Sequence, residues 1–159
     1  MDRGRDMTSN GRRVAIVTGG SQGIGAGLVA GYRRQGWAVV ASARKIKATE
    51  DPDVLVVEGD LAEPATADRI VDGALERFGR IDILVNNAGV YISKPFTDYT
   101  AADYALASGV NLAGFFWITQ RAIAEMATRY GGHVVNITAT LAEVANSGEP
   151  TVLSALTKG

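Results

Sequence analysis

The sequence predicts an α/β protein in which a parallel sheet is covered by helices on both faces. Short runs of apolar and β-branched residues alternate with longer segments of helical period. The short runs are almost continuously apolar, as expected of strands that are buried on both faces. Glycine is also abundant, with 19 in 159 residues, or about 12% against a usual level of about 7%. No G-X-Y period explains this surplus, so the glycines are expected to serve turns and close backbone contacts.

Five strands are expected, joined by right-handed crossovers because the sheet is parallel. They are the β-branched run at Val14–Thr18 and the later runs Trp37–Ala43, Val54–Glu58, Ile81–Val85 and His133–Thr138. The chain length suits a single domain. We expect this domain to span residues 13–159, after a charged and disordered tail at residues 1–12.

The helical spacing of apolar residues predicts helices between these strands. The expected helices are Ile24–Gln35, Ala65–Phe78 ending at Gly79, Ala101–Ser108, Leu112–Tyr130, and a last one beginning near Thr151. The Leu112–Tyr130 helix carries four consecutive apolar residues, 115–118, which cover more of its circumference than a one-sided surface helix needs. This surplus predicts a second partner for that helix.

Composition argues against several classes of protein. Sixteen Lys and Arg against 17 Asp and Glu leave a charge of −1, whereas binders of nucleic acid or membrane surfaces need an excess of positive charge. The absence of cysteine excludes disulfides, thiolate metal sites and a cysteine nucleophile, and it suits a cytoplasmic location. No apolar run approaches the roughly 20 residues that span a bilayer. The only histidine, His133, has no clustered partner, so no metal site is expected.

The segment Thr18–Gly25 follows the first expected strand and opens the first helix with the spacing G-x-x-x-G-x-G. A phosphate binds where backbone N–H groups and the positive end of a helix dipole point at it, and side chains would obstruct that approach. A glycine-rich turn that serves only packing is the alternative, but the position between strand and helix favours a dinucleotide site. The residues expected to hold the cofactor here are Gly19, Ser21, Gln22, Gly23, Ile24 and Gly25.

The second strand indicates which dinucleotide is bound. Binders of NAD(H) usually carry an acidic residue about 20 positions after the glycine turn, where this chain has Ala43 followed by Arg44 and Lys45. Arg44 and Lys45 place two positive charges where they would attract the 2′-phosphate of NADP(H). We therefore expect NADP(H) to be preferred, with NAD(H) possible, and Arg44 to contact the cofactor.

Three further motifs occur in order: Asp60-Leu61 after the third strand, Asn86-Asn87-Ala88-Gly89 after the fourth, and Asn111 in the helical region. With the glycine turn, they make the chain similar to the short-chain dehydrogenase/reductase family over nearly all of residues 13–159. The resemblance implies a Rossmann-type, doubly wound, three-layer α/β/α fold. It also implies that Asp60 and Leu61 lie at the adenine, and that Asn87, Ala88 and Gly89 lie beside the adenosine ribose. Asp60 could also be the N-cap of the next helix, because Asp60 to Glu63 form a D-x-x-E pattern.

Members of the family place a Ser in the loop after the fifth strand and Tyr-x-x-x-Lys in the next helix. By this resemblance Asn111 and Lys158 take their family positions, and Lys158 would also hold the cofactor ribose. Ser154 occupies the tyrosine position, however, and Ala139 the serine position. An aliphatic hydroxyl is a far weaker acid than a phenol, whose pKa is near 10.

Other hydroxyl groups could assist the reaction. Thr138 and Thr140 could orient a carbonyl group, and Tyr91, at the carboxyl end of the fourth strand, could act as the acid. Alternatively, Ser154 and Lys158 could form the Ser–Lys catalytic pair of a hydrolase. We keep Asn111, Lys158, Ser154, Thr138, Thr140 and Tyr91 as the candidate catalytic residues.

The sequence thus predicts an NADP(H)-dependent oxidoreductase acting on a carbonyl/alcohol pair of a small molecule. The alternative is a cofactor-binding relative with little or no activity, a sensor or an inactive partner. The family resemblance implies a homo-oligomer, a dimer or tetramer, formed through the Leu112–Tyr130 helix. A doubly wound sheet has at least six strands, whereas this sequence provides five, so C-terminal strands are expected to be missing from this chain.

Overall fold

The computed structural model describes residues 11–129, 131–144 and 148–158. Five parallel strands form one sheet in the order β3-β2-β1-β4-β5. This arrangement confirms the predicted doubly wound α/β fold. Most of the expected tail, residues 1–10, lies outside the described residues. The strands are β1 (Val14–Thr18), β2 (Ala38–Ala43), β3 (Val54–Glu58), β4 (Ile83–Asn86) and β5 (His133–Asn136).

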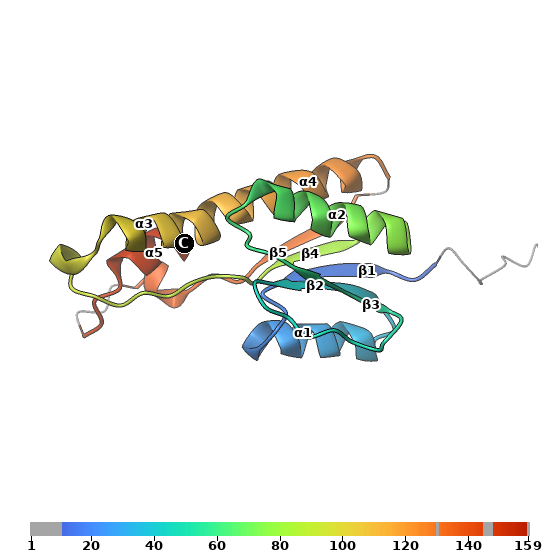
Figure 1. Cartoon of the computed structure of the whole chain (residues 1–159), viewed down its shortest axis with the longest axis horizontal. Coiled ribbons are helices and arrows are strands. Elements are labelled where there is room, and N and C mark those ends of the chain that lie inside the picture. The colour runs from blue at the N-terminus through green and yellow to red at the C-terminus, as the bar shows by residue number, and fades with distance from the viewer. Residues whose placement is uncertain (1–10, 130, 145–147, 159) are drawn as a thin grey trace, which may run out of the picture.

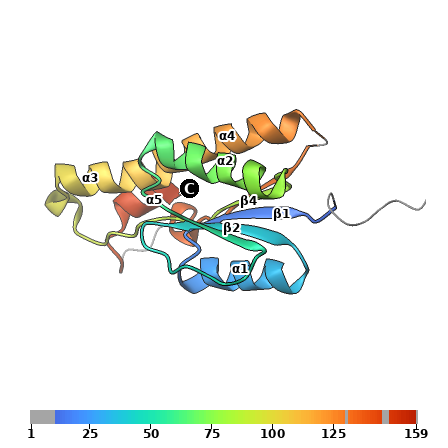
Figure 2. The same cartoon turned by 45° about the vertical axis from the view of Figure 1, so that its right-hand side comes forward.

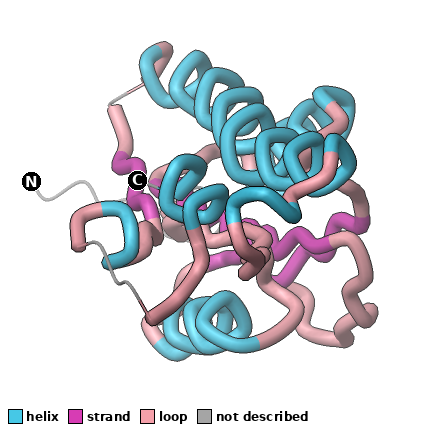
Figure 3. The backbone as a smooth tube through the Cα atoms, turned by 90° about the vertical axis from the view of Figure 1, so that its left-hand side faces the viewer, coloured by secondary structure: helices cyan, strands magenta, loops and turns pink. Residues whose placement is uncertain are grey.

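Helices cover both faces of the sheet (Figures 1 and 2). Helices α2 (Pro64–Phe78) and α4 (Phe115–Ala127) lie together on one face, and α1 (Gly23–Arg34) lies on the other. Seen along the strands, the sheet forms the middle layer between helices (Figure 3). The three layers explain why the sequence shows apolar runs in place of alternation: both faces of the central strands must be buried.

The central strand β1 is buried along its whole length. Its residues alternate between two cores, because successive side chains of a strand point to opposite faces. Ile16 packs in the larger core with Ile70 of α2 and Ile118 of α4, whereas Val17 packs in the smaller core beneath α1. The apolar stripes of the three helices therefore fix the sheet from both sides.

The chain between β4 and β5 differs from the prediction. The two helices expected at Ala101–Ser108 and Leu112–Tyr130 are one continuous helical stretch, formed by α3 (Ala101–Ala107), a π-helical segment η2 (Ser108–Gly114) and α4. Gly114 is required there because a Cβ would lie 2.9 Å from the Cβ and the carbonyl oxygen of Leu61. The π-helical segment contains Asn111, and π-helical turns are frequent at functional sites.

The last strand is shorter than predicted. β5 ends at Asn136, not at Thr138, and a 3₁₀ turn (Thr140–Ala142) then leads toward the short helix α5 (Val152–Lys158). The ends of α3 and α5 lie beyond the carboxyl ends of the strands, at the left of Figure 1. No helix of the described chain is long and apolar enough to cross a membrane.

Candidate cofactor groove and active site

The glycine turn packs directly against the loop that follows β4. Gly19 has a φ of 69°, a conformation suited to glycine, and a Cβ there would lie 2.9 Å from the Cα of Ala88. A Cβ on Gly25 would collide with the carbonyl oxygen of Gly19 and lie 2.6 Å from Nδ2 of Asn87. Glycine is thus required at position 19 by both conformation and space, and at position 25 by space.

The turn also leaves backbone donors open. Gly20 donates its N–H to the carbonyl oxygen of Ser42 on β2 at 2.9 Å, which ties the turn to the sheet. The next five N–H groups, from Ser21 to Gly25, make no hydrogen bond with the described part of the chain, and the side chain of the N-cap residue Gln22 does not cap α1. These donors surround the positive end of the α1 dipole. The geometry suits an anion such as a pyrophosphate.

The N-N-A-G segment holds this turn in place. Thr18 Oγ1 accepts hydrogen bonds from the backbone N–H groups of Asn87 and Ala88, both at 3.0 Å. Asn87 Nδ2 donates to the carbonyl oxygen of Thr18 at 2.9 Å. Asn86 Nδ2 donates to Thr119 Oγ1 at 2.9 Å and to Asn136 Oδ1 at 3.1 Å, so it joins β4 to α4 and β5. The first two residues of the motif therefore brace the carboxyl edge of the sheet.

A groove of about 570 Å³ runs from the glycine turn past the ends of β2 and β3. Of the residues predicted to bind the cofactor, Gly23, Ile24, Gly25, Asn87 and Lys158 do not line this groove. Gly25 and Asn87 instead shape the turn behind it, and Ile24 is 64% exposed at the start of α1. The lining comprises Gly19, Ser21, Gln22, Ala43, Arg44, Lys45, Gly59, Asp60, Leu61, Ala88, Gly89, Val90 and Val110.

The alternative role of Asp60 as a helix N-cap was wrong. Helix α2 begins at Pro64, and Glu63 is its N-cap. Proline is favoured in the first turn of a helix, where its missing N–H costs nothing, so it sets the start of α2 later than the D-x-x-E pattern suggests. Asp60 instead closes a local turn, because its Oδ1 accepts the N–H of Ala62 at 3.0 Å.

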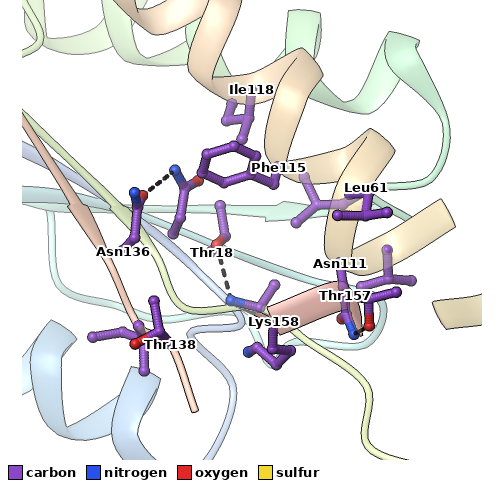
Figure 4. A pocket seen from close by; sticks show the side chains of 14 residues that line it. Thr18, Leu61, Asn111, Phe115, Ile118, Asn136, Thr138, Thr157 and Lys158 are labelled. Atoms are coloured by element: carbon purple, nitrogen blue, oxygen red, sulfur yellow. Dashed lines mark hydrogen bonds between the residues drawn. The ribbon is translucent and has the colours of Figure 1, made fainter. Parts of the chain in front are cut away.

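A second, smaller pocket of about 130 Å³ lies deeper, between the ends of β4 and β5 and the π-helical segment (Figure 4). Asn111 forms one side of it. Its Oδ1 accepts the N–H of Val90 at 2.8 Å, and its Nδ2 donates to the carbonyl oxygen of Val90 at 3.0 Å and to Thr157 Oγ1 at 2.9 Å. The lining residues that were not among the predicted site residues are Thr18, Asn86, Val110, Leu112, Phe115, Ile118, Asn136, Ile137 and Thr157.

Lys158 is the one ionisable side chain among the 14 described residues that line this pocket. Its Nζ lies against Gly89, where a Cβ would collide with it, so this glycine of the N-N-A-G motif makes room for the ammonium group. Burial lowers the pKa of Lys158 below its usual value of 10.5, because desolvation disfavours the charged form. The lysine position expected from the family resemblance is therefore at the pocket.

Ser154 is placed differently from the expectation. It is 3% exposed, and its hydroxyl donates to the carbonyl oxygen of Ile92 and accepts the N–H of Ile92, both at 3.1 Å. It lines neither the groove nor the inner pocket. Among the described residues its hydroxyl hydrogen-bonds to Ile92 and not to Lys158, so the catalytic role of Ser154 and its pairing with Lys158 stay predictions. Ser154 instead fastens the loop after β4 to α5.

The other candidate hydroxyl groups separate into two sets. Thr138 lines the inner pocket, whereas Thr140 begins the 3₁₀ turn and does not. Tyr91 is 59% exposed, lines neither pocket, and its hydroxyl lies 3.4 Å from Glu149 Oε2. Tyr91 therefore lies outside the lining of the inner pocket, and its role as the acid stays a prediction.

The loop between Tyr91 and α3 is fixed by an ion pair. Lys94 Nζ lies 2.7 Å from Asp103 Oδ2, and the same carboxylate accepts the N–H and the hydroxyl of Thr100 in a capping box. The hydrogen bond from Lys94, followed by those from Thr100, lowers the pKa of Asp103 to about 2. The start of α3 is thereby tied to the loop that follows β4 at neutral pH.

Comparison with known proteins agrees with this geometry. The family model described as short chain dehydrogenase matches residues 13–151. A granaticin polyketide synthase putative ketoacyl reductase 2 of Streptomyces violaceoruber is 39% identical over 133 residues. A (2S)-[(R)-hydroxy(phenyl)methyl]succinyl-CoA dehydrogenase subunit of Thauera aromatica is 36% identical over 152 residues. The chain belongs to the short-chain dehydrogenase family.

Solved structures show the same fold. A short-chain dehydrogenase/reductase from Serratia marcescens superposes with a TM-score of 0.83 at 33% identity, covering 92% of this chain and 66% of that one. A short chain dehydrogenase from Bacillus anthracis gives a TM-score of 0.82 at 27% identity, with coverage of 92% and 64%. The two relatives above match 78% and 90% of this chain, but these matches cover only 53% and 61% of their own lengths. The chain thus spans a little over half the length of these relatives.

Proposed function

We propose that this protein is an NADP(H)-dependent oxidoreductase acting on a carbonyl/alcohol pair of a small molecule. The observation that carries the proposal is the set of open N–H groups from Ser21 to Gly25 at the start of α1, next to a groove of about 570 Å³ that Ser21 and Gln22 line. The two relatives described above are named as a ketoacyl reductase and a dehydrogenase. Both names describe interconversion of a carbonyl and an alcohol, which supports the proposed reaction class.

The phosphorylated cofactor is favoured by charge in the groove. Arg44 and Lys45 are exposed at its rim, directly after β2. Asp60 is the only carboxylate among the groove's described lining residues, and its Oδ1 is engaged by the N–H of Ala62. A 2′-phosphate at the end of β2 would therefore meet two cations and no acidic side chain there.

Reversing the charge of Arg44 should exchange the cofactor preference. We expect Arg44→Asp to weaken NADPH binding by about 10- to 150-fold, since a charge-assisted hydrogen bond contributes about 1.5–3 kcal/mol. NADH binding should stay equal or improve. The measurement is titration of both cofactors by their fluorescence, with Arg34→Gln as the control, because Arg34 is an exposed arginine on α1 outside the groove. Tighter binding of NADH than of NADPH by the wild-type chain contradicts the assignment.

A side chain of the inner pocket provides the proton for the substrate oxygen. A bound nicotinamide supplies or accepts the hydride, so the chain must bring a proton to or from the substrate oxygen. Ser154 is tied to Ile92, which leaves the half-buried ammonium group of Lys158 as the acid at the pocket. Thr138 lines the same pocket and orients the substrate oxygen, while Asn111 positions the loop at Val90 and Thr157 of α5.

The alternative, a cofactor-binding relative without turnover, has its basis in the substitutions at Ser154 and Ala139. The enzyme is favoured because the inner pocket holds an ionisable side chain, Lys158, whose pKa is lowered by burial, and such groups are frequent at active sites. Screening the protein against a panel of ketones and alcohols separates the two functions, because only the enzyme oxidises NADPH in the presence of a carbonyl substrate.

We further propose a cytoplasmic homo-oligomer that uses the exposed side of α4. Phe116 is 51% exposed and Ile123 is 49% exposed on this helix, with Leu112 of the π-helical segment 47% exposed beside them. Trp117 and Ile118, by contrast, pack on the core. Large apolar side chains grouped on one helix are typical of an interface with another protein.

A further inference from the structure

We infer a second binding site, for a small organic anion, at the edge of the sheet opposite the cofactor groove. A hollow of about 490 Å³ opens where β1, β4 and β5 begin, at the right of Figure 1. Its volume lies within the range of ligand-binding cavities. The inference does not depend on the proposed oxidoreductase function. The hollow is lined by Arg13, Trp37, Arg80, Ile81, Asp82, Arg129, Gly131, Gly132 and His133.

Asp82, the only acidic residue in this lining, is already neutralised. Its Oδ2 accepts hydrogen bonds from Arg80 Nε at 2.9 Å and from the N–H of Val14 at 2.8 Å. Its Oδ1 accepts from Arg80 Nη2 at 2.5 Å. Arg80 and Asp82 thus form a closed pair, and their charges cancel within the wall of the hollow.

Arg13 and Arg129 retain their charge. Both are exposed, and neither forms an ion pair with a carboxylate of the described chain. Helices α2 and α4 end nearby, at Phe78 and Ala127, and each C-terminus contributes the equivalent of about −0.5 charge. Two arginines against two helix ends leave a charge of about +1 facing the hollow.

The walls are fixed in position before any ligand binds. Gly131 has a φ of 83° and donates its N–H to the carbonyl oxygen of Met126 at 3.2 Å, which closes the end of α4. Gly132 packs closely on Met126 and on the carbonyl oxygen of Asp82, from which a Cβ there would lie 2.7 Å (Cγ) and 3.1 Å. The N–H of His133 donates to the carbonyl oxygen of Asp82 at 3.0 Å, which joins β5 to the neighbouring wall.

Trp37 gives the hollow its apolar side, and Ile81 lies behind it in the core. The guanidinium group of Arg13 lies 5.2 Å from the centre of the Trp37 ring, so the cation stands beside an aromatic wall. Ile81 is 4% exposed and part of the larger core. This combination fits a phosphate or carboxylate group carried on a small aromatic or aliphatic body, with the charged group between Arg13 and Arg129.

The two tryptophans permit a position-specific test on the full chain. Trp37 lies in the hollow, whereas Trp117 packs on the core from α4 and is the internal control. Inorganic phosphate and phenyl phosphate are titrated at constant ionic strength while the two indole N–H signals are followed by NMR. We expect the Trp37 signal alone to move, and phenyl phosphate to bind about 2- to 10-fold more tightly than phosphate because its ring contacts Trp37.

Two substitutions test whether Arg13 and Arg129 bind the anion. Arg13→Gln and Arg129→Gln should each weaken phenyl phosphate binding by about two- to fivefold, as expected for exposed charge pairs, and the double variant should weaken it further. Arg34→Gln, an exposed arginine elsewhere on the surface, should leave it unchanged. A Trp37 signal that is unmoved, that moves equally with chloride, or that responds identically in the double variant overturns the inference.

Discussion

Gly25→Ala is expected to destabilise the protein by about 1–3 kcal/mol and to abolish measurable cofactor binding, because the added methyl group overpacks a closed turn. The Cβ would collide with the carbonyl oxygen of Gly19 and would lie 2.6 Å from Asn87 Nδ2. Asn87 holds the turn through Thr18, so the displaced side chain would release both segments. Urea unfolding measures the stability, and enhancement of NADPH fluorescence measures binding.

Gly27→Ala is the matched control on the same helix. Nothing lies within 4 Å of a Cβ on Gly27. Alanine in an exposed helix position is more favourable than glycine by about 0.8–1.0 kcal/mol, so this variant should be slightly more stable and bind cofactor as the wild type does. The two substitutions thus differ in sign although their chemistry is identical. If Gly25→Ala also stabilises the protein and binds NADPH normally, the close packing of the turn is wrong.

Lys158→Met is expected to lower the rate of carbonyl reduction by about 10²- to 10⁴-fold, the usual contribution of a general acid. In the wild type the ammonium form donates the proton, so the reduction rate should fall as the pH rises through the pKa of Lys158. Burial places this pKa below 10.5. Alcohol oxidation needs the neutral amine and should rise over the same range. The measurement is the pH dependence of the rate in both directions. In Lys158→Met, the change of rate through the pKa of Lys158 (the pH-dependent limb of the profile) should be absent in both.

Two control variants distinguish proton transfer by Lys158 from an effect of its positive charge and from an effect on folding. Lys158→Arg keeps the positive charge but cannot lose its proton in the accessible pH range, so cofactor binding should survive while the pH-dependent limb disappears. Ser154→Ala removes the hydrogen bonds to Ile92 and leaves the N–H of Ile92 without its partner, whereas the carbonyl oxygen of Ile92 keeps the hydroxyl of Tyr99 at 3.0 Å. The loss should cost about 1 kcal/mol of stability. The Ser154→Ala variant should keep the pH-dependent limb of the rate profile. A Lys158→Met profile that matches the wild type contradicts the role of Lys158.

The strands and the glycine turn could be predicted because their causes are local. The continuous apolar run at Val14–Thr18 matches β1 in both bounds, as does Val54–Glu58 for β3. Gly79 ends α2 in the left-handed conformation, with a φ of 76°, as its position after an amphipathic segment indicated. Periodicity and glycine position are read directly from neighbouring residues, so these features did not need the tertiary structure.

The inner pocket could not be predicted in the same way, because distant segments build it. Asn111 meets Thr157 across 46 residues of sequence, and Ser154 meets Ile92 across 62. The π-helical segment at Ser108–Gly114 was missed because one extra residue in a turn barely changes the apolar pattern of a long helix. Motif spacing placed Ser154 in a catalytic position, whereas only its hydrogen bonds show that its hydroxyl is used for structure.

The central claim is that the open amides of residues 21–25 hold the pyrophosphate of the cofactor. Titrating nitrogen-15-labelled protein with NADP⁺ tests it most directly. We expect the backbone amide signals of Ser21 to Gly25 to shift together as NADP⁺ binds, while those of the opposite edge, such as His133, stay in place. Saturable binding that leaves the five amides unmoved, or no binding at all, would contradict the account.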